Sequence, residues 1–240
     1  MQEIINITPD TSLLPKLGKS GYSTAQAIAE LVDNSIDAIN TTKQVGEINI
    51  TIDKSFIKVY DNGSGMTKEE LINSLRLAKS NKQNQLGRFG LGLKTAALSL
   101  GSYFSITTKS TKENFLYTVN YDEERWKEHS DWTIPLEYSE NNGGFSFTEI
   151  LIKSLKNKIP VNTIDKIKLD IGQRYAPFIQ NGEINVYVNK QKCFPLPPVL
   201  LEGTKRDIKI PFLWEGKKLG TITGWVGLLK EGSNKGNYGF

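Results

Sequence analysis

Polar side chains recur along residues 26–37 at spacings that place them on one side of a helix. Steps of about 100° per residue bring Gln26, Glu30, Asp33, Asn34 and Asp37 within about one third of the circumference. The three carboxylates are neighbours at i,i+3 and i,i+4, where like charges cost about 0.2–0.5 kcal/mol per pair. No basic residue occurs between positions 24 and 42. We therefore expect a positive group against this face, the alternative being an ordinary solvated helix surface.

Magnesium suits this face chemically. An asparagine carbonyl among carboxylates provides hard oxygen ligands, and Mg²⁺ usually takes only one or two ligands from a protein and fills its other positions with water and phosphate oxygens.

A second set of residues follows an alternating apolar run. Asp61 ends that run and opens the turn Asp61-Asn62-Gly63-Ser64-Gly65. A carboxylate at a strand end can accept a hydrogen bond from an amine, and the glycines let a flat ligand approach the backbone. By itself, such a segment is most often only a turn.

A third set is a glycine-rich segment, residues 87–92, which runs directly into a helix carrying Lys94 in its first turn. Unpaired N–H groups and the positive end of the helix dipole favour a polyphosphate there, whereas tight packing is the alternative use of the glycines. A P-loop does not fit, because Leu93 separates Gly92 from the lysine. A dinucleotide fingerprint does not fit either, because Thr95 occupies the place of its third glycine.

Local patterns predict the elements that position these residues. A capping box at Ser23-Thr24-Ala25-Gln26 opens a helix to about residue 40, and a second capping box opens a helix at Thr67. Alternation predicts a hairpin over 48–59, and a polar, lid-like stretch covers 79–85. The remaining expectations are a helix over 93–100 closed by Gly101 in the C′ position, strands at 103–108, 115–121 and 145–152, a helix over 163–178, a strand at 183–189 and a hairpin over 207–229 that turns at 215–217.

Composition limits the class of protein. The 240 residues are 38% hydrophobic and 23% charged, with no apolar run near the ~20 residues of a membrane span and no secretory signal at the start. The single cysteine, Cys193, cannot form an internal disulfide, which favours a reducing, cytoplasmic location. Residues 1–149 carry 15 Lys/Arg and 19 Asp/Glu, whereas residues 150–240 carry 15 and 7. The basic second part fits an anionic partner, or simply a solvated surface of scattered lysines.

The order of the three sets resembles the GHKL ATPases (gyrase, heat-shock chaperone, histidine kinase and MutL). Residues 30–38 resemble their N box, residues 61–66 the first glycine box and residues 87–92 the second, with most likeness to the MORC and MutL branch. Thr148 falls near the place of a later threonine motif, although Phe147 stands where that motif has glycine.

This resemblance implies an α/β (α+β) two-layer sandwich, the Bergerat ATP-binding fold, over residues 1–158, followed by a partial transducer-like unit over residues 159–240. It implies ATP and Mg²⁺ as cofactors, Glu30 as the general base and Asn34 as the metal ligand. Asp61 would bind the adenine amino group. The implied ATP-binding residues are Asn34, Asp37, Asp61, Gly65, Met66, Gly87, Arg88, Phe89, Gly90, Leu91, Gly92, Lys94 and Thr148.

The resemblance further implies slow ATP hydrolysis and an ATP-dependent homodimer, a clamp within a longer protein that acts on DNA or on a protein client. Two rival interpretations stay open. One is a sensing module that holds nucleotide without hydrolysing it, and the other is a DNA-binding protein with a decayed ATP site, which rests on the basic second part.

Overall fold

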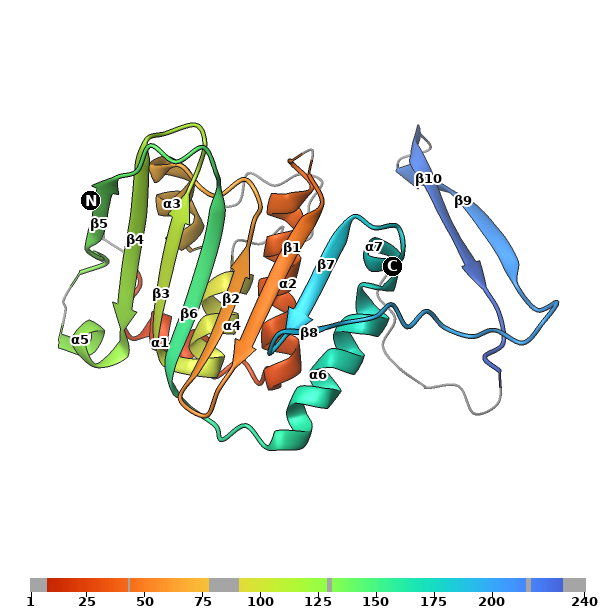
Figure 1. The fold of residues 1–240 in the computed structure, drawn as a ribbon, viewed down its shortest axis with the longest axis horizontal. Helices are drawn as coiled ribbons and strands as arrows, with labels where there is room; N and C mark the ends of the chain where they lie inside the picture. The colour runs from red at the N-terminus through yellow and green to blue at the C-terminus, as the bar shows by residue number, and fades with distance from the viewer. Residues whose placement is uncertain (1–7, 43, 78–90, 129–130, 215–216, 231–240) are drawn as a thin grey trace, which may run out of the picture.

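An eight-stranded mixed sheet forms the centre of the protein, in the order β5-β4-β3-β6-β2-β1-β7-β8 (Figure 1). The computed structural model describes residues 8–42, 44–77, 91–128, 131–214 and 217–230. The strands of this sheet are β1 (Gly46–Ile52), β2 (Phe56–Asp61), β3 (Gly101–Lys109), β4 (Phe115–Asp122), β5 (Leu136–Glu140), β6 (Phe147–Leu155), β7 (Ile184–Val188) and β8 (Gln191–Lys192). Neighbouring strands are antiparallel except β1 and β7, which run parallel.

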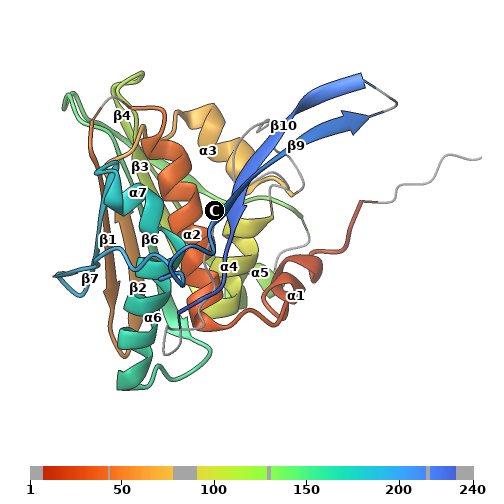
Figure 2. The same cartoon turned by 90° about the vertical axis from the view of Figure 1, so that its right-hand side faces the viewer.

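Helices cover one face of this sheet, which gives the two-layer α/β arrangement expected from the sequence (Figure 2). The helices are α1 (Leu13–Leu17), α2 (Thr24–Ile39), α3 (Lys68–Leu75), α4 (Gly92–Leu100), α5 (Glu123–Glu128), α6 (Val161–Arg174) and α7 (Ala176–Gln180). Helix α2 packs against α4, α6 and the strands β1 and β2. No helix among the described residues is long and apolar enough to cross a membrane.

The core lies between the sheet and helices α2 and α4. The apolar stripe of α2, with Ile28, Leu31, Val32 and Ile36, is fully buried against the inward residues of the strands. Both predicted capping boxes are confirmed: Ser23 accepts from the Gln26 amide, and Thr67 caps α3 in the same way. Because these caps satisfy amides that have no partner within the helix, they fix where α2 and α3 begin.

Two sequence predictions need correction. The helix expected over 163–178 is interrupted at Tyr175, because Pro177 has no amide hydrogen to continue the ladder of hydrogen bonds. Gly101 does not occupy a left-handed C′ position; its φ is −149°, and it begins β3. A Cβ there would lie 2.3 Å from the Lys153 carbonyl oxygen, so the glycine permits close approach of β6.

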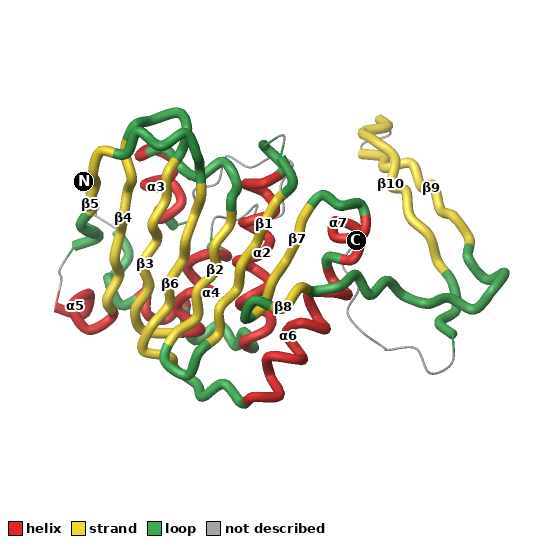
Figure 3. Tube along the Cα trace, viewed as in Figure 1, coloured by secondary structure: helices red, strands yellow, loops and turns green. Residues whose placement is uncertain are grey.

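A separate two-stranded hairpin, β9 (Arg206–Trp214) with β10 (Lys217–Val226), follows the main sheet and stands away from it (Figure 3). The predicted domain boundary at 158/159 falls between β6 and α6. The main sheet continues beyond it, since β7 pairs with β1 through residues 46–50 and 184–188.

Candidate functional site

A cavity of about 1340 Å³ lies between α2, α3, the start of α4 and the ends of strands β2 and β6. The sequence-predicted residues that line it are Glu30, Asn34, Asp37, Asp61, Gly65, Met66, Gly92, Lys94 and Thr148. Residues far apart in the chain therefore meet around one space. Leu91 is the N-cap of α4, and the predicted Gly87, Arg88, Phe89 and Gly90, together with the lid-like stretch 79–85, lie outside the described residues.

Three polar side chains form a row across neighbouring strands, and two of them, Asp61 and Thr148, line the cavity. Asp61 on β2 is opposite Thr148 on β6, which is opposite Thr108 on β3. All three are buried, with exposed fractions of 4%, 7% and 0%. Burial raises the pKa of Asp61 to about 6, although hydrogen bonds from the Gly63 amide and the Ser35 hydroxyl favour its charged form. A buried carboxylate with this environment is suited to binding one polar group of a ligand.

Sequence reasoning missed two residues that hold this row in place. The Ser35 hydroxyl lies 3.0 Å from Asp61 Oδ2, and the Thr108 hydroxyl accepts from the Met66 amide at 2.9 Å. Thr108 Oγ1 also donates to the Phe147 carbonyl. Ser35 and Thr108 are polar residues at positions where the helical and strand periodicity calls for apolar ones. A polar residue at a core position was the sequence signal that could have identified them.

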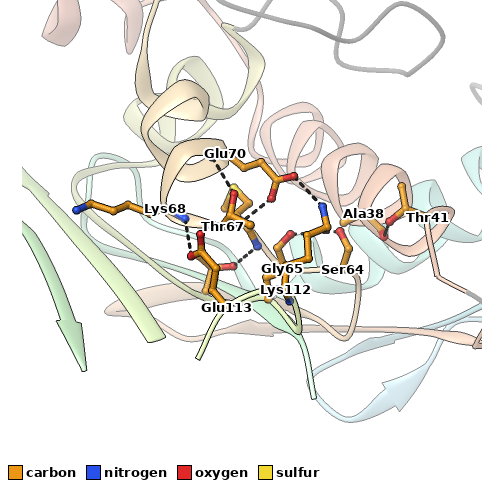
Figure 4. A network of polar contacts seen from close by, with 12 residues as sticks. Ala38, Thr41, Ser64, Gly65, Thr67, Lys68, Glu70, Lys112 and Glu113 are labelled. Carbon is orange, nitrogen blue, oxygen red and sulfur yellow. Dashed lines mark hydrogen bonds and ion pairs between the residues drawn. The ribbon is translucent and has the colours of Figure 1, made fainter. Parts of the chain in front are cut away.

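The turn after β2 contacts α2 on one side (Figure 4) and the end of β3 on the other. The Ser64 amide donates to the Ala38 carbonyl of α2 at 3.1 Å, and Gly65 has a φ of +60°. A Cβ at Gly65 would lie within 2 Å of the carbonyl oxygen of Lys109, so only glycine fits there.

The start of α3 is tied to the turn between β3 and β4, which lines the same cavity (Figure 4). Lys112 forms an ion pair with Glu70 at 3.1 Å, and the Lys68 amide donates to the Glu113 carboxylate at 3.1 Å. These contacts give this part of the cavity wall a defined position.

At the opposite end, the carboxylate of Glu30 faces the start of α4. A Cβ placed on Gly92, the first residue of α4, would lie 2.5 Å from Glu30 Oε2. Helix α4 has no side-chain cap, so its first amides lack a partner of that kind. Burial, and after it the Asp33 carboxylate, raise the pKa of Glu30, while the Arg174 guanidinium opposes the rise.

Asn34 lines the cavity next to the carboxylates of α2. Its side-chain Nδ2 donates to the Glu30 carbonyl at 2.8 Å, one turn earlier in α2. This contact uses one of the two N–H groups of the amide and does not involve Oδ1, which can therefore serve a ligand. An asparagine oxygen next to carboxylates matches the donor chemistry of Mg²⁺.

Lys94 has a different set of partners from those the sequence suggested. Its Nζ donates to the carbonyl oxygens of Ser74 at 2.5 Å and Arg76 at 3.0 Å, at the C-terminal end of α3. The side chain is only 2% exposed, and burial lowers its pKa to about 8. Lys94 also lines the cavity, so in this structure it joins α4 to α3 at the cavity wall.

An arginine from a distant segment acts on the acidic face of α2. Arg174, at the end of α6, lowers the pKa of both Glu30 and Asp33, although burial keeps both pKa values above their ordinary range. The Tyr175 hydroxyl donates to Asp33 Oδ1 at 2.7 Å. Asp33 therefore has partners in α6 and at the α6–α7 junction, which sequence spacing did not indicate.

Comparison with known protein families gives one matching model. Residues 22–155 match the family described as histidine kinase-, DNA gyrase B- and HSP90-like ATPase. This range is more than half of the chain and contains every site residue that the sequence predicted.

Individual relatives agree with this match. Over 94 residues the chain is 37% identical to Protein MICRORCHIDIA 3 of Arabidopsis thaliana, covering 37% of this chain and 16% of the relative. Over 109 residues it is 36% identical to ATPase MORC2B of Mus musculus, covering 41% of this chain and 10% of the relative. The chain thus spans only a small part of the curated relatives it matches.

A solved structure shares the fold. The ATPase region of Saccharomyces cerevisiae topoisomerase II superposes with a TM-score of 0.53 at 16% identity, covering 70% of this chain and 48% of that one.

Proposed function

Because the chain belongs to the histidine kinase-, DNA gyrase B- and HSP90-like ATPase family, we propose that it binds ATP with Mg²⁺ in this cavity and hydrolyses it slowly. Asp61 would accept the adenine amino group, with Thr148, Gly65 and Met66 around the base. The start of α4 at Gly92 would receive the phosphates, together with residues 87–90. Asp37 and Leu91 complete the proposed ATP-binding set.

The observation that carries the proposal is the approach of Glu30 to Gly92. The N-terminus of α4 suits a terminal phosphate, and the Glu30 carboxylate lies beside it. Both are in the same cavity as the buried Asp61. A water between Glu30 and that phosphate would lose its proton to the carboxylate as it attacks, and the raised pKa of Glu30 improves it as a base. Such activation of water distinguishes a hydrolase from a phosphotransferase.

The donor set fits magnesium. Asn34 Oδ1 would be the protein ligand, and the remaining positions would be filled by water and phosphate oxygens. Bound there, Mg²⁺ would neutralise charge on the phosphates. Lys94 would contribute to the phosphates after exchanging its carbonyl partners on α3, since it already lines the cavity.

Calorimetry of ATP binding with and without Mg²⁺ tests the pocket. Wild type should bind ATP, Asp61→Asn should not, and Asn34→Ala should lose the Mg²⁺ dependence while retaining weak binding. If wild type fails to bind millimolar ATP, the proposal is wrong.

Measurement of phosphate release tests hydrolysis separately. Glu30→Gln should reduce turnover at least ~100-fold and leave the Kd for ATP within about threefold, because the substitution removes the base and keeps the shape. A protein that binds ATP but releases no phosphate above background would instead be a nucleotide sensor.

The assembly and client are further parts of the proposal. We propose that ATP drives two copies together as a clamp within a longer protein, with a domain boundary near 158/159, a cytoplasmic location, and DNA as one client. The excess of basic residues over 150–240 and the topoisomerase II relative support a DNA client.

Sedimentation with a non-hydrolysable ATP analogue tests dimerisation. A salt titration of DNA binding tests the client: contacts with phosphates give affinity that falls steeply with salt. If the affinity for DNA is the same with and without nucleotide, the protein is better described as a DNA-binding protein with a decayed ATP site.

A further inference from the structure

The interruption between α6 and α7 turns one tyrosine towards α2. Tyr175 has φ −106° and ψ 16°, outside the helical range of its neighbours, and its side chain is 2% exposed. Its hydroxyl oxygen lies 2.7 Å from Asp33 Oδ1 and 3.0 Å from the Ala29 carbonyl oxygen. A break in one helix therefore creates a polar contact with another.

The two partners of this hydroxyl bracket the residue proposed as the base. Ala29 and Asp33 are four positions apart on α2, and Glu30 lies between them on the same turn. Asp33 directly precedes Asn34. A hydrogen bond from a hydroxyl to a carboxylate is charge-assisted and shorter than a neutral one, so it fixes the Asp33 side chain firmly.

A second contact in the same segment stabilises the end of α6. Arg174 pairs with Asp170, one turn earlier in the helix, through Nε–Oδ2 and Nη2–Oδ1 contacts, both 3.3 Å. Tyr175 directly follows this turn, and its buried side chain contacts α2 from the end of α6.

We propose that Tyr175 is a positioning residue for ATP hydrolysis, an inference that rests on the proposed function. Its hydroxyl keeps the Asp33 carboxylate directed to the α6–α7 junction and away from the phosphates and Mg²⁺. The same contact holds the α2 turn that carries Glu30 and Asn34 at its present distance from Gly92. Residues beyond the matched family range, 22–155, therefore complete the site.

Tyr175→Phe tests this role because it removes only the hydroxyl and keeps the buried ring. We expect kcat to fall about tenfold, since small displacements of reacting groups are costly, while the Kd for ATP by calorimetry changes less than about threefold. The matched control is Tyr187→Phe on β7, where the side chain points away from the helices; its kcat should equal that of wild type. Melting temperatures of both variants report whether the fold is kept.

A double-mutant cycle with Asp33→Asn gives a second readout. If the hydroxyl acts through Asp33, the double variant should lose little more kcat than the more damaging single variant. If the two effects multiply, Tyr175 does not act through Asp33, and the inference is overturned.

The outcomes separate this inference from the proposed function. Wild-type turnover with an unchanged kcat in Tyr175→Phe overturns the positioning role alone. An equal loss of kcat and of ATP affinity also overturns it, because that pattern indicates general damage to the pocket. The absence of ATP binding or turnover in wild type overturns the proposed function and this inference with it.

Discussion

Asp61 and Thr148 stand directly opposite one another on β2 and β6, with both side chains buried on the helix side of the sheet. Thr108 on β3 continues the row. Three polar residues in the interior of neighbouring strands are unusual in a core and require partners. Here the partners are Ser35, two backbone amides and one carbonyl, and the hydroxyls of Thr108 and Thr148 lie 3.2 Å apart. Asp61 and Thr148 line the cavity and offer it a recognition surface.

Asp61→Asn should abolish ATP binding without weakening the fold. An amide in place of the carboxylate presents a donor as well as an acceptor to the adenine amino group, so the two donors oppose each other. Calorimetry should show at least a ~100-fold loss of affinity. The control Asn49→Ala on β1, a residue that does not line the cavity, should bind ATP like wild type.

The same substitution should change how stability depends on pH. The folded-state pKa of Asp61 is about 6, above its ordinary value of 3.8, so ionisation opposes folding. This penalty is absent below pH 3.8, grows as pH rises through 6, and reaches at most about 3 kcal/mol. The melting temperature of Asp61→Asn relative to wild type should therefore increase from pH 4 to pH 7. A difference that stays constant with pH would contradict the burial of a charged Asp61.

Thr108→Val should weaken both the fold and the pocket. Valine has the same shape but cannot accept from the Met66 amide or donate to the Phe147 carbonyl, so the free energy of unfolding should fall by about 1–3 kcal/mol. ATP affinity should fall because Met66 lines the cavity. Thr107→Val, on the opposite face of β3, is the matched control for denaturant unfolding and calorimetry.

Gly92→Ala should reduce turnover more than ATP binding. The new Cβ would lie 2.5 Å from Glu30 Oε2, so the carboxylate must move away from the start of α4. Because alanine favours a helix over glycine by about 1 kcal/mol, the melting temperature should not fall. Gly224→Ala on β10, where a Cβ meets nothing within 4 Å, is the control. Unchanged phosphate release by Gly92→Ala would contradict the assigned position of Glu30.

Lys94 should make ATP binding depend on pH near 8. Burial lowers its pKa to about 8, so its charge in the free protein is lost as pH rises from 7 to 9. Wild-type affinity for ATP should fall over that range, and Lys94→Met should bind more weakly at pH 7 with little change towards pH 9. Parallel pH profiles for the two proteins would show that Lys94 does not contact the phosphates.

Local patterns were enough to predict much of this protein. The two capping boxes, the hairpin of β1 and β2, and the motifs at 30–38 and 61–66 depend on residues within one or two turns of each other. Periodicity and turn chemistry act over that range, so they can be read from the chain alone. The same reasoning failed at Gly101 and at the α6–α7 break, where the approach of β6 and the missing amide of Pro177 decided the outcome.

Tertiary structure alone decided which groups meet the predicted residues. Tyr175 reaches Asp33 across 142 positions, and Arg174 of the same segment lowers the pKa of that carboxyl. Lys94 binds carbonyls of α3, and Thr108 reaches Met66 from 42 positions away. The sequence determined the chemistry available on each element, because side-chain type and local spacing are properties of the chain. The pairing of those elements is set by how the sheet and helices pack, and no local spacing encodes it.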